Sequence, residues 1–118
     1  MTAADWIEGY KRAWASNAPG DIRALFTDDA SYAYHPVGDS IEGIDAIVAT
    51  WVKNGDAPGD FTFEYEVLSD DGTLAFVQGV TDYSANENPV YDNLWVIRFA
   101  ADGRATSFTE WYVERKAR

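Results

Sequence analysis

The chain has 118 residues, of which 47% are hydrophobic and 15% aromatic, and its formal net charge is −11; this length predicts a single domain spanning residues 1–118. The absence of cysteine excludes disulfides and thiolate chemistry, and a single histidine, His35, excludes a multi-histidine metal centre. The acidic balance argues against a nucleic-acid partner, and the lack of a long apolar stretch or signal peptide argues against a membrane partner, so we expect a cytoplasmic protein.

Helices are predicted mainly in the first half of the chain. Residues 2–18 carry tryptophan, tyrosine and alanine at three- and four-residue spacing, which is typical of an amphipathic helix. Pro19, followed by glycine, predicts the end of this helix. A short second helix is expected over residues 22–26, capped by Asp21, and a third over residues 44–53.

Strands are predicted from the alternation of apolar residues and from the turn residues between the runs. The expected strands cover residues 30–35, 61–68, 73–83 and two segments within 90–114. Asp28 and Asp29 predict a turn before the first strand, and Ala-Asp-Gly-Arg at 101–104 predicts the tight turn of the last hairpin. Helices first and a strand meander last favour an α+β fold, with the helices on one face of a curved antiparallel sheet.

The last hairpin carries large apolar side chains on both faces. Phe108, Glu110 and Tyr112 share one face of its second strand, and Asn93 and Trp95 share a face of the first. One face can cover the core, and the other then needs a helix layer or a second subunit. Glu110 is the single acid in the apolar part of the hairpin. It is either a solvated or ion-paired glutamate or a carboxylate that faces an internal cavity.

These elements, in this order, resemble the nuclear transport factor 2-like (cystatin-like α+β cone) superfamily, in its branch of SnoaL-like polyketide cyclases and ketosteroid isomerases. The segments that carry the resemblance are LFTDDASY at 25–32, His35-Pro36, AIVATW at 46–51, RFAADGR at 98–104 and FTEWY at 108–112. The resemblance covers nearly the whole chain. It implies a sheet wrapped around a conical cavity roofed by the helices, and a homodimer formed through the outer face of the sheet. This fold hosts enzymes and binding modules alike.

The catalytic residues of the isomerase branch are not preserved at the matching positions. The resemblance places His35, or Tyr34 in an alignment without a gap, where that branch has its proton-removing aspartate. Trp14 falls near the position of the oxyanion tyrosine, with Tyr10 one turn earlier, and Trp95 takes the place of the protonated aspartate. Indole N–H groups donate hydrogen bonds but do not titrate usefully. We therefore do not expect steroid isomerase activity.

His35 and Glu110 form the expected catalytic pair. The resemblance places Glu110 on the cavity face, where burial without a cation favours the neutral acid, and the pKa of an imidazole already suits proton transfer near neutral pH. Alternatively, His35 simply ends its strand and bonds to backbone. The residues expected to contact a ligand are seven aromatic residues and one asparagine: Trp14, Tyr34, Trp51, Tyr65, Asn93, Trp95, Phe108 and Tyr112. The same rings could instead serve only as core.

The sequence leaves two main classes of function open. The first is a cofactor-free acid/base enzyme of the isomerase, cyclase, hydratase or hydrolase type, acting on a small hydrophobic, ring-bearing metabolite without a metal. The second is a module that holds a small hydrophobic molecule without turnover, or that serves mainly in dimerisation. A third possibility is a cone filled by its own tryptophans. An enzyme requires a titratable group inside the cavity within reach of a ligand atom.

Overall fold

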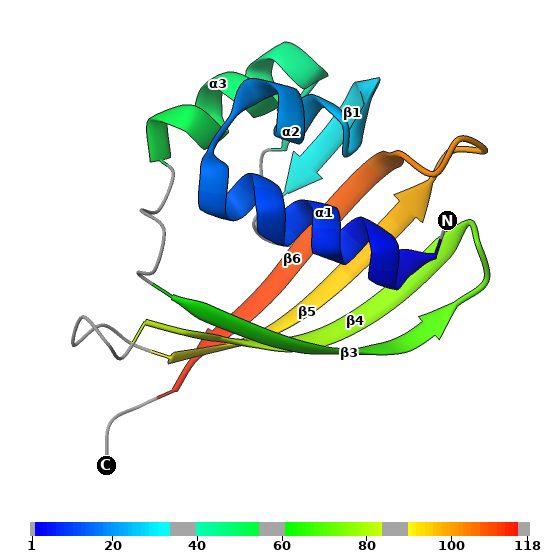
Figure 1. Ribbon diagram of the computed structural model, residues 1–118. Helices are drawn as coiled ribbons and strands as arrows, with labels where there is room; N and C mark the ends of the chain where they lie inside the picture. Colours follow the sequence, from blue (N-terminus) through cyan, green and yellow to red (C-terminus); the bar gives the residue numbers. More distant parts are fainter. Residues whose placement is uncertain (1, 34–39, 55–60, 84–89, 116–118) are drawn as a thin grey trace.

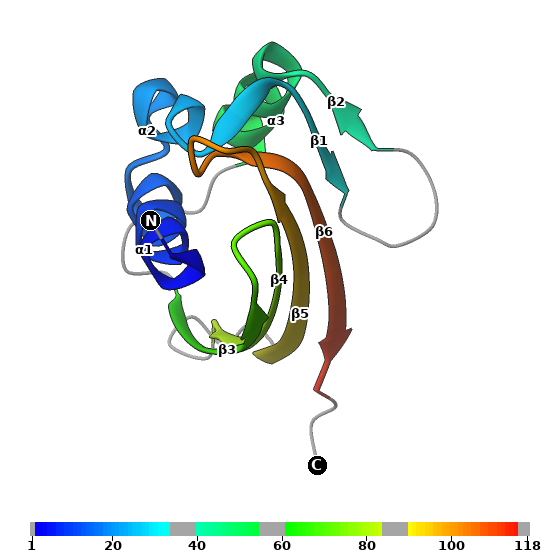
Figure 2. The same ribbon diagram turned by 90° about the vertical axis from the view of Figure 1, so that its right-hand side faces the viewer.

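A computed structural model describes residues 2–33, 40–54, 61–83 and 90–115. Within these ranges, a curved six-stranded sheet wraps around the helices, which lie on its concave side (Figure 1, Figure 2). The strand order is β2-β1-β6-β5-β4-β3, so the sheet has two open edges and does not close into a barrel. This arrangement confirms the predicted α+β fold. None of the described helices is both long and apolar enough to cross a membrane.

The described helices are α1 (Ala3–Ser16), α2 (Pro19–Arg23) and α3 (Ile44–Asn54). Thr2 caps α1, because its hydroxyl accepts a hydrogen bond from the Asp5 N–H while the Asp5 carboxylate accepts one from the Thr2 N–H. Asn17 ends α1 in a left-handed conformation. The first helix ends before Pro19, as predicted, but the expected second helix over residues 22–26 with Asp21 as its cap is wrong, because α2 spans Pro19–Arg23. Pro19 begins α2, since the first turn of a helix does not use that N–H.

The described strands are β1 (Phe26–Ala33), β2 (Ile41–Glu42), β3 (Thr62–Asp70), β4 (Leu74–Asp82), β5 (Val90–Phe99) and β6 (Ala105–Glu114). Strands β3 to β6 form the predicted antiparallel meander. β1 instead runs parallel to β6, and β2 pairs with β1, neither of which was expected. Asp28 and Asp29 lie inside β1, so the predicted turn there is wrong. The register of β1 against β6 shifts over this stretch, which leaves both aspartates exposed within an irregular strand.

The predicted turn of the last hairpin is confirmed. The Ala100 N–H donates to the Arg104 carbonyl at 2.8 Å, and Gly103 has a φ of 88°, which favours glycine at this position. The resulting register places Trp95 opposite Glu110 on the inner face. The sequence-based assignment of these side chains to one face is therefore correct.

Aromatic rings fill the concave side of the sheet beneath α1. Trp95 and Phe108 are 1% and 0% exposed. Tyr10 of α1 packs on both, with ring centroids 4.6 Å from Trp95 and 5.4 Å from Phe108. Trp6, one turn earlier, stacks on Phe108 at 5.9 Å. The burial of these rings holds α1 on the sheet.

Gly79 of β4 provides a site where one added methyl group has a large steric effect. A Cβ there would lie 2.6 Å from two ring atoms of Phe63 and 3.1 Å from the Glu64 carbonyl oxygen. Phe63 cannot easily move away, because it stacks on Trp95 at 4.7 Å. We expect Gly79→Ala to lower the free energy of unfolding by about 1–3 kcal/mol, as measured by urea denaturation.

Gly20 is the matched control for this substitution, because a Cβ there would meet no atom within 4 Å. Gly20→Ala in α2 should leave stability unchanged or raise it slightly. Equal losses for the two variants would show that steric crowding against Phe63 is not the cause.

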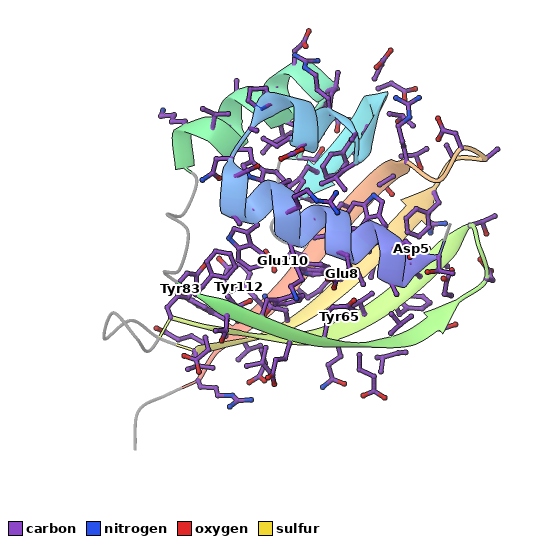
Figure 3. All side chains as sticks on the ribbon, in the orientation of Figure 1. Asp5, Glu8, Tyr65, Tyr83, Glu110 and Tyr112 are labelled. Atoms are coloured by element: carbon purple, nitrogen blue, oxygen red, sulfur yellow. The ribbon has the colours of Figure 1, made fainter. Side chains whose placement is uncertain are left out.

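A second contact joins α1 to the edge strand β3. The Tyr65 hydroxyl donates to Glu8 Oε2 at 2.8 Å, and Lys11 Nζ lies 3.8 Å from the same oxygen. Figure 3 shows Tyr65 and Glu8 close together between β3 and α1. Burial raises the pKa of Tyr65 above its ordinary value of about 10, and the bond to Glu8 raises this pKa further. The neutral phenol is therefore the form that stabilises the fold.

Tyr65→Phe should lower the free energy of unfolding by about 1 kcal/mol near neutral pH, since it removes one hydrogen bond to a charged group. Because the folded pKa of Tyr65 is raised, this contribution is complete below the unfolded pKa and is lost as the pH rises through the folded value. The difference between wild type and variant, measured by urea denaturation, should therefore be constant near neutral pH and shrink in alkali. A difference that does not change with pH would contradict this role for the hydroxyl.

Candidate functional site

Four polar and aromatic side chains form a hydrogen-bonded group inside the aromatic concave face. Glu110 Oε2 accepts from Asn93 Nδ2 at 2.7 Å and from Trp95 Nε1 at 2.9 Å. The Thr81 hydroxyl donates to Asn93 Oδ1 at 2.8 Å. Thr81 and Asn93 are 3% and 7% exposed, and Glu110 is half-buried. We call these four residues the Glu110 group.

The strand register explains why these residues meet. Trp95 of β5 lies directly opposite Glu110 of β6, and Asn93 lies two residues away on the same face of β5. Thr81 of β4 pairs with Tyr91, so Asn93 is its diagonal neighbour. The group therefore crosses three adjacent strands, whose backbone hydrogen bonds fix its geometry.

The donors around Glu110 determine its chemical character. Both described bonds to Oε2 come from N–H groups, and such donors favour the ionised form of a carboxylate. Burial alone, which is what the sequence indicated, acts in the opposite direction by favouring the neutral acid. A carboxylate held in this way accepts protons, so the arrangement suits a general base.

A row of aromatic rings lies at the end of the sheet where β3 begins and β4 ends. Phe61, Tyr83, Tyr91 and Tyr112 follow one another with centroid distances of 5.9, 6.1 and 5.6 Å. Trp14 of α1 stacks on Phe61 at 4.0 Å. We call these five residues the aromatic row. Tyr112 is 42% exposed, so the row is accessible to solvent at that position.

The Glu110 group lies between this row and the packed core. Glu110 stands two residues before Tyr112 on the same face of β6, and Phe108 stands two residues further in. Figure 3 shows Tyr83 and Tyr112 at the open end of the sheet, with Glu110 deeper under α1. A ring-bearing ligand resting on the row would therefore meet Glu110 next.

The other residues expected to contact a ligand have different surroundings. Trp95 and Phe108 belong to the packed core. Trp51 of α3 is half-buried, with its ring 4.9 Å from Tyr10. Tyr65 bonds to Glu8 at the edge of the sheet. Ligand contact by each of them stays a prediction.

Tyr34 and His35 lie outside the residues that the structure describes. The proposed proton-transfer pair of His35 and Glu110 therefore stays a prediction.

Sequence reasoning missed Thr81 and Tyr91, and it left Tyr83 undecided between the rim of the expected cavity and the outer face of the sheet. Tyr91 alternates with Asn93 and Trp95, which were assigned to the inner face, so the period-two pattern could have found it. The sequence did not show on which face of its strand Tyr83 lies, because Gly79 has no side chain and so interrupts the alternation of apolar and polar residues.

A buried pair of tyrosine hydroxyls forms a second polar contact in the core. The hydroxyls of Tyr10 and Tyr32 lie 2.7 Å apart, and the residues are 6% and 5% exposed. The Tyr32 ring stacks on Phe108 at 4.7 Å. The pair helps to join α1 to β1 across the core, because buried hydroxyls require hydrogen-bond partners.

Two further features bear on bound groups. No set of three or more acidic, histidine or cysteine side chains in the described part of the chain could hold a metal ion. A hollow of about 20 Å³ lies at the opposite end of the sheet, with room for roughly one water molecule. Its lining residues are Thr2, Ala3, Asp70, Gly72, Phe99 and Gly103. None of them belongs to the Glu110 group.

The sequence profile of the SnoaL-like domain family matches residues 7–108, which is most of the chain. The chain belongs to the SnoaL-like family. No curated protein matches this SnoaL-like domain significantly.

Solved structures share its fold at low sequence identity. An NTF-2-like protein of unknown function from Burkholderia xenovorans has a TM-score of 0.75 and 16% identity, covering 98% of this chain and 85% of that one. A steroid delta-isomerase from Pseudomonas aeruginosa has a TM-score of 0.66 and 19% identity, covering 94% and 79%. An LEH-like epoxide hydrolase from M. tuberculosis has a TM-score of 0.63 and 17% identity, covering 92% and 80%. These similarities establish the NTF2-like fold of the domain.

Proposed function

We propose that this SnoaL-like domain is a cofactor-free acid/base enzyme of the isomerase, cyclase, hydratase or hydrolase type. Its substrate is a small, hydrophobic, ring-bearing molecule. The observation that carries the proposal is the Glu110 carboxylate, which accepts two N–H hydrogen bonds on one oxygen and lies beside the aromatic row. A base at the inner end of an aromatic surface is what such chemistry requires.

In this scheme the aromatic row orients the substrate and Glu110 moves the proton. The rings of Tyr91 and Tyr112, in edge contact at 5.6 Å, offer faces on which a ring can stack. Glu110 takes a proton from a carbon beside a carbonyl group or from an attacking water, and returns it to the product in a later step. His35 remains the predicted partner for that return.

The relatives support the class of reaction but not a substrate. The isomerase and the epoxide hydrolase of the same fold are named for reactions on small molecules, and at 19% and 17% identity they share only the fold with this chain. The resemblance puts Trp14 near one position, and Trp95 at the other, where the isomerase branch has its oxyanion donors. The proposal therefore does not include steroid isomerisation.

The alternative is a domain that binds a small hydrophobic ligand without turnover. The packing of the core favours it, because Trp95 and Phe108 leave almost no exposed surface for a substrate to contact. A ligand would then be held by the aromatic row alone. In that case the Glu110 group would serve to stabilise the sheet.

The two functions can be separated with a panel of neutral cyclic ketones, lactones and epoxides. Binding is followed by NMR through the indole N–H of Trp95, which bonds to Glu110, and turnover is followed by mass spectrometry of the mixture. We expect at least one compound both to shift that signal and to be converted, with a rate that rises as a carboxylate ionises. Binding without conversion would support the ligand-binding alternative, and no binding across the panel would contradict both functions.

We also propose that the domain forms a homodimer through the outer face of its sheet. Trp111 and Phe76 on this face are 47% and 36% exposed. The register places Trp111 opposite Leu94 and Phe76 opposite Val96, so the apolar side chains are contiguous across three strands. Exposed apolar patches of this kind are typical of protein interfaces.

Trp111→Glu should convert this dimer to a monomer, as measured by sedimentation velocity, because two symmetry-related carboxylates would be buried at the interface. Val52→Glu is the matched control, since Val52 is similarly exposed, at 49%, but lies on α3. A wild-type protein that sediments as a monomer would contradict the proposal.

A further inference from the structure

We propose that Thr81 is a positioning residue for Glu110, which it never touches. Its hydroxyl donates to Asn93 Oδ1 and so anchors the amide while the Asn93 N–H is turned toward the carboxylate. The inference rests on the proposed function in one respect: Thr81 helps to keep Glu110 ionised, and ionised Glu110 is the proposed base. The hydrogen bonds that support the inference join Thr81, Asn93 and Glu110, and they do not depend on any substrate.

The Asn93 amide could fit its site in two orientations, because its oxygen and nitrogen ends have nearly the same shape. In the described orientation, Oδ1 accepts from Thr81 at 2.8 Å and Nδ2 donates to Glu110 at 2.7 Å. The reversed orientation would place Oδ1 against the carboxylate, and two acceptors at that distance repel each other. The carboxylate therefore turns Oδ1 away from itself, and this buried oxygen then needs a donor of its own.

Thr81 supplies this donor in a place where water is nearly excluded. Thr81 is 3% exposed and Asn93 is 7% exposed. A buried carbonyl oxygen without a partner is costly, so the loss of the hydroxyl would loosen the hold on the amide and weaken its bond to Glu110. Glu110 would then lose the hydrogen bond from the Asn93 N–H, which is one of its two described N–H donors. The ionised carboxylate would become less favourable.

Among the residues that the structure describes, phenols are the titratable side chains whose ring contacts place them beside the group. Tyr91 of β5 and Tyr112 of β6 flank the group from the aromatic row, and Tyr10 of α1 packs on Trp95. Tyr32 of β1 bonds to Tyr10. A phenol is intrinsically a much weaker acid than a carboxyl group.

The test is a carboxyl ¹³C NMR titration of Glu110, without substrate, in wild type, Thr81→Val and Thr81→Ser. Valine keeps the shape of threonine and suits a strand, so packing is retained while the hydroxyl is lost. We expect Thr81→Val to move the titration midpoint of Glu110 upward by on the order of one pH unit. Thr81→Ser, which restores the hydroxyl, should titrate like wild type.

Two additions keep the result decisive. Thr81→Ala provides a second variant without the hydroxyl if Thr81→Val does not fold, and it should show the same upward shift. A parallel set in a His35→Gln background removes the only imidazole of the chain, so that its titration cannot be mistaken for that of Glu110.

An unchanged midpoint in a folded variant without the hydroxyl would overturn the inference, as would an equal shift in Thr81→Ser. Because no substrate is present, either result can be distinguished from a failure of the proposed enzymatic function.

Discussion

Replacing Phe108 by alanine should lower the free energy of unfolding by about 3–5 kcal/mol. The ring is fully buried, with centroids of neighbouring rings 4.7 Å away at Tyr32, 5.0 Å away at Trp95 and 5.4 Å away at Tyr10. These neighbours come from β1, β5 and α1. The substitution would therefore leave a cavity where the two ends of the chain meet, and it would remove a large part of the stability of a typical small domain.

Tyr112→Ala is the matched control for Phe108→Ala. Tyr112 lies on the same face of the same strand and is 42% exposed, so its loss should cost much less in urea denaturation at equal protein concentration. Similar losses for the two variants would contradict the assignment of Phe108 to a tightly packed core. A selective loss at Phe108 would show that Tyr112, at the open end of the sheet, contributes little to stability, as expected for the proposed ligand-binding surface.

The antiparallel meander could be predicted because its signals are local. In β3, Phe63, Tyr65 and Val67 alternate with exposed residues, and the observed burial follows the same alternation. In the last hairpin, a glycine at the turn fixes the register of both strands, so side chains on one face could be matched from the order of the residues alone. Period-two patterning reports directly which face of a strand is buried.

The first strand was only partly predictable because its pairing is not local. β1 runs beside β6 at the far end of the sequence, and its irregular register accommodates Asp28 and Asp29 inside a strand. A pair of aspartates gives the same local signal in a turn and in such a strand. The two-residue strand β2 is too short to produce any alternation.

The candidate site was predictable in part for the same reason. Glu110 could be singled out because an acid among apolar residues is conspicuous in a sequence. Thr81 could not, because threonine is common in strands and its role depends on Asn93, a diagonal neighbour on the next strand. Hydrogen-bonding partners across strands follow from register, which the alternation of β4 alone does not determine.

Glu110→Gln should lower kcat by about 10²–10⁴-fold on any substrate that the panel identifies, because it removes the proposed general base. The amide retains the size of the carboxylate, and its oxygen can still accept hydrogen bonds from Asn93 and Trp95, so the fold should be preserved. Steady-state kinetics across pH provide the measurement. Wild-type activity should rise as the carboxylate ionises, and the residual activity of the variant should lack that step.

Glu64→Gln is the control for this change, because Glu64 lies exposed on β3 and its substitution alters the net charge equally. Its kcat should stay within a few-fold of wild type. If Glu110→Gln retained nearly full activity with an unchanged pH profile, Glu110 would not be the base, and its bonds to Asn93 and Trp95 would have to be explained by stability alone. A large loss confined to Glu110→Gln would instead identify the inner end of the aromatic row as the place where the proton is moved.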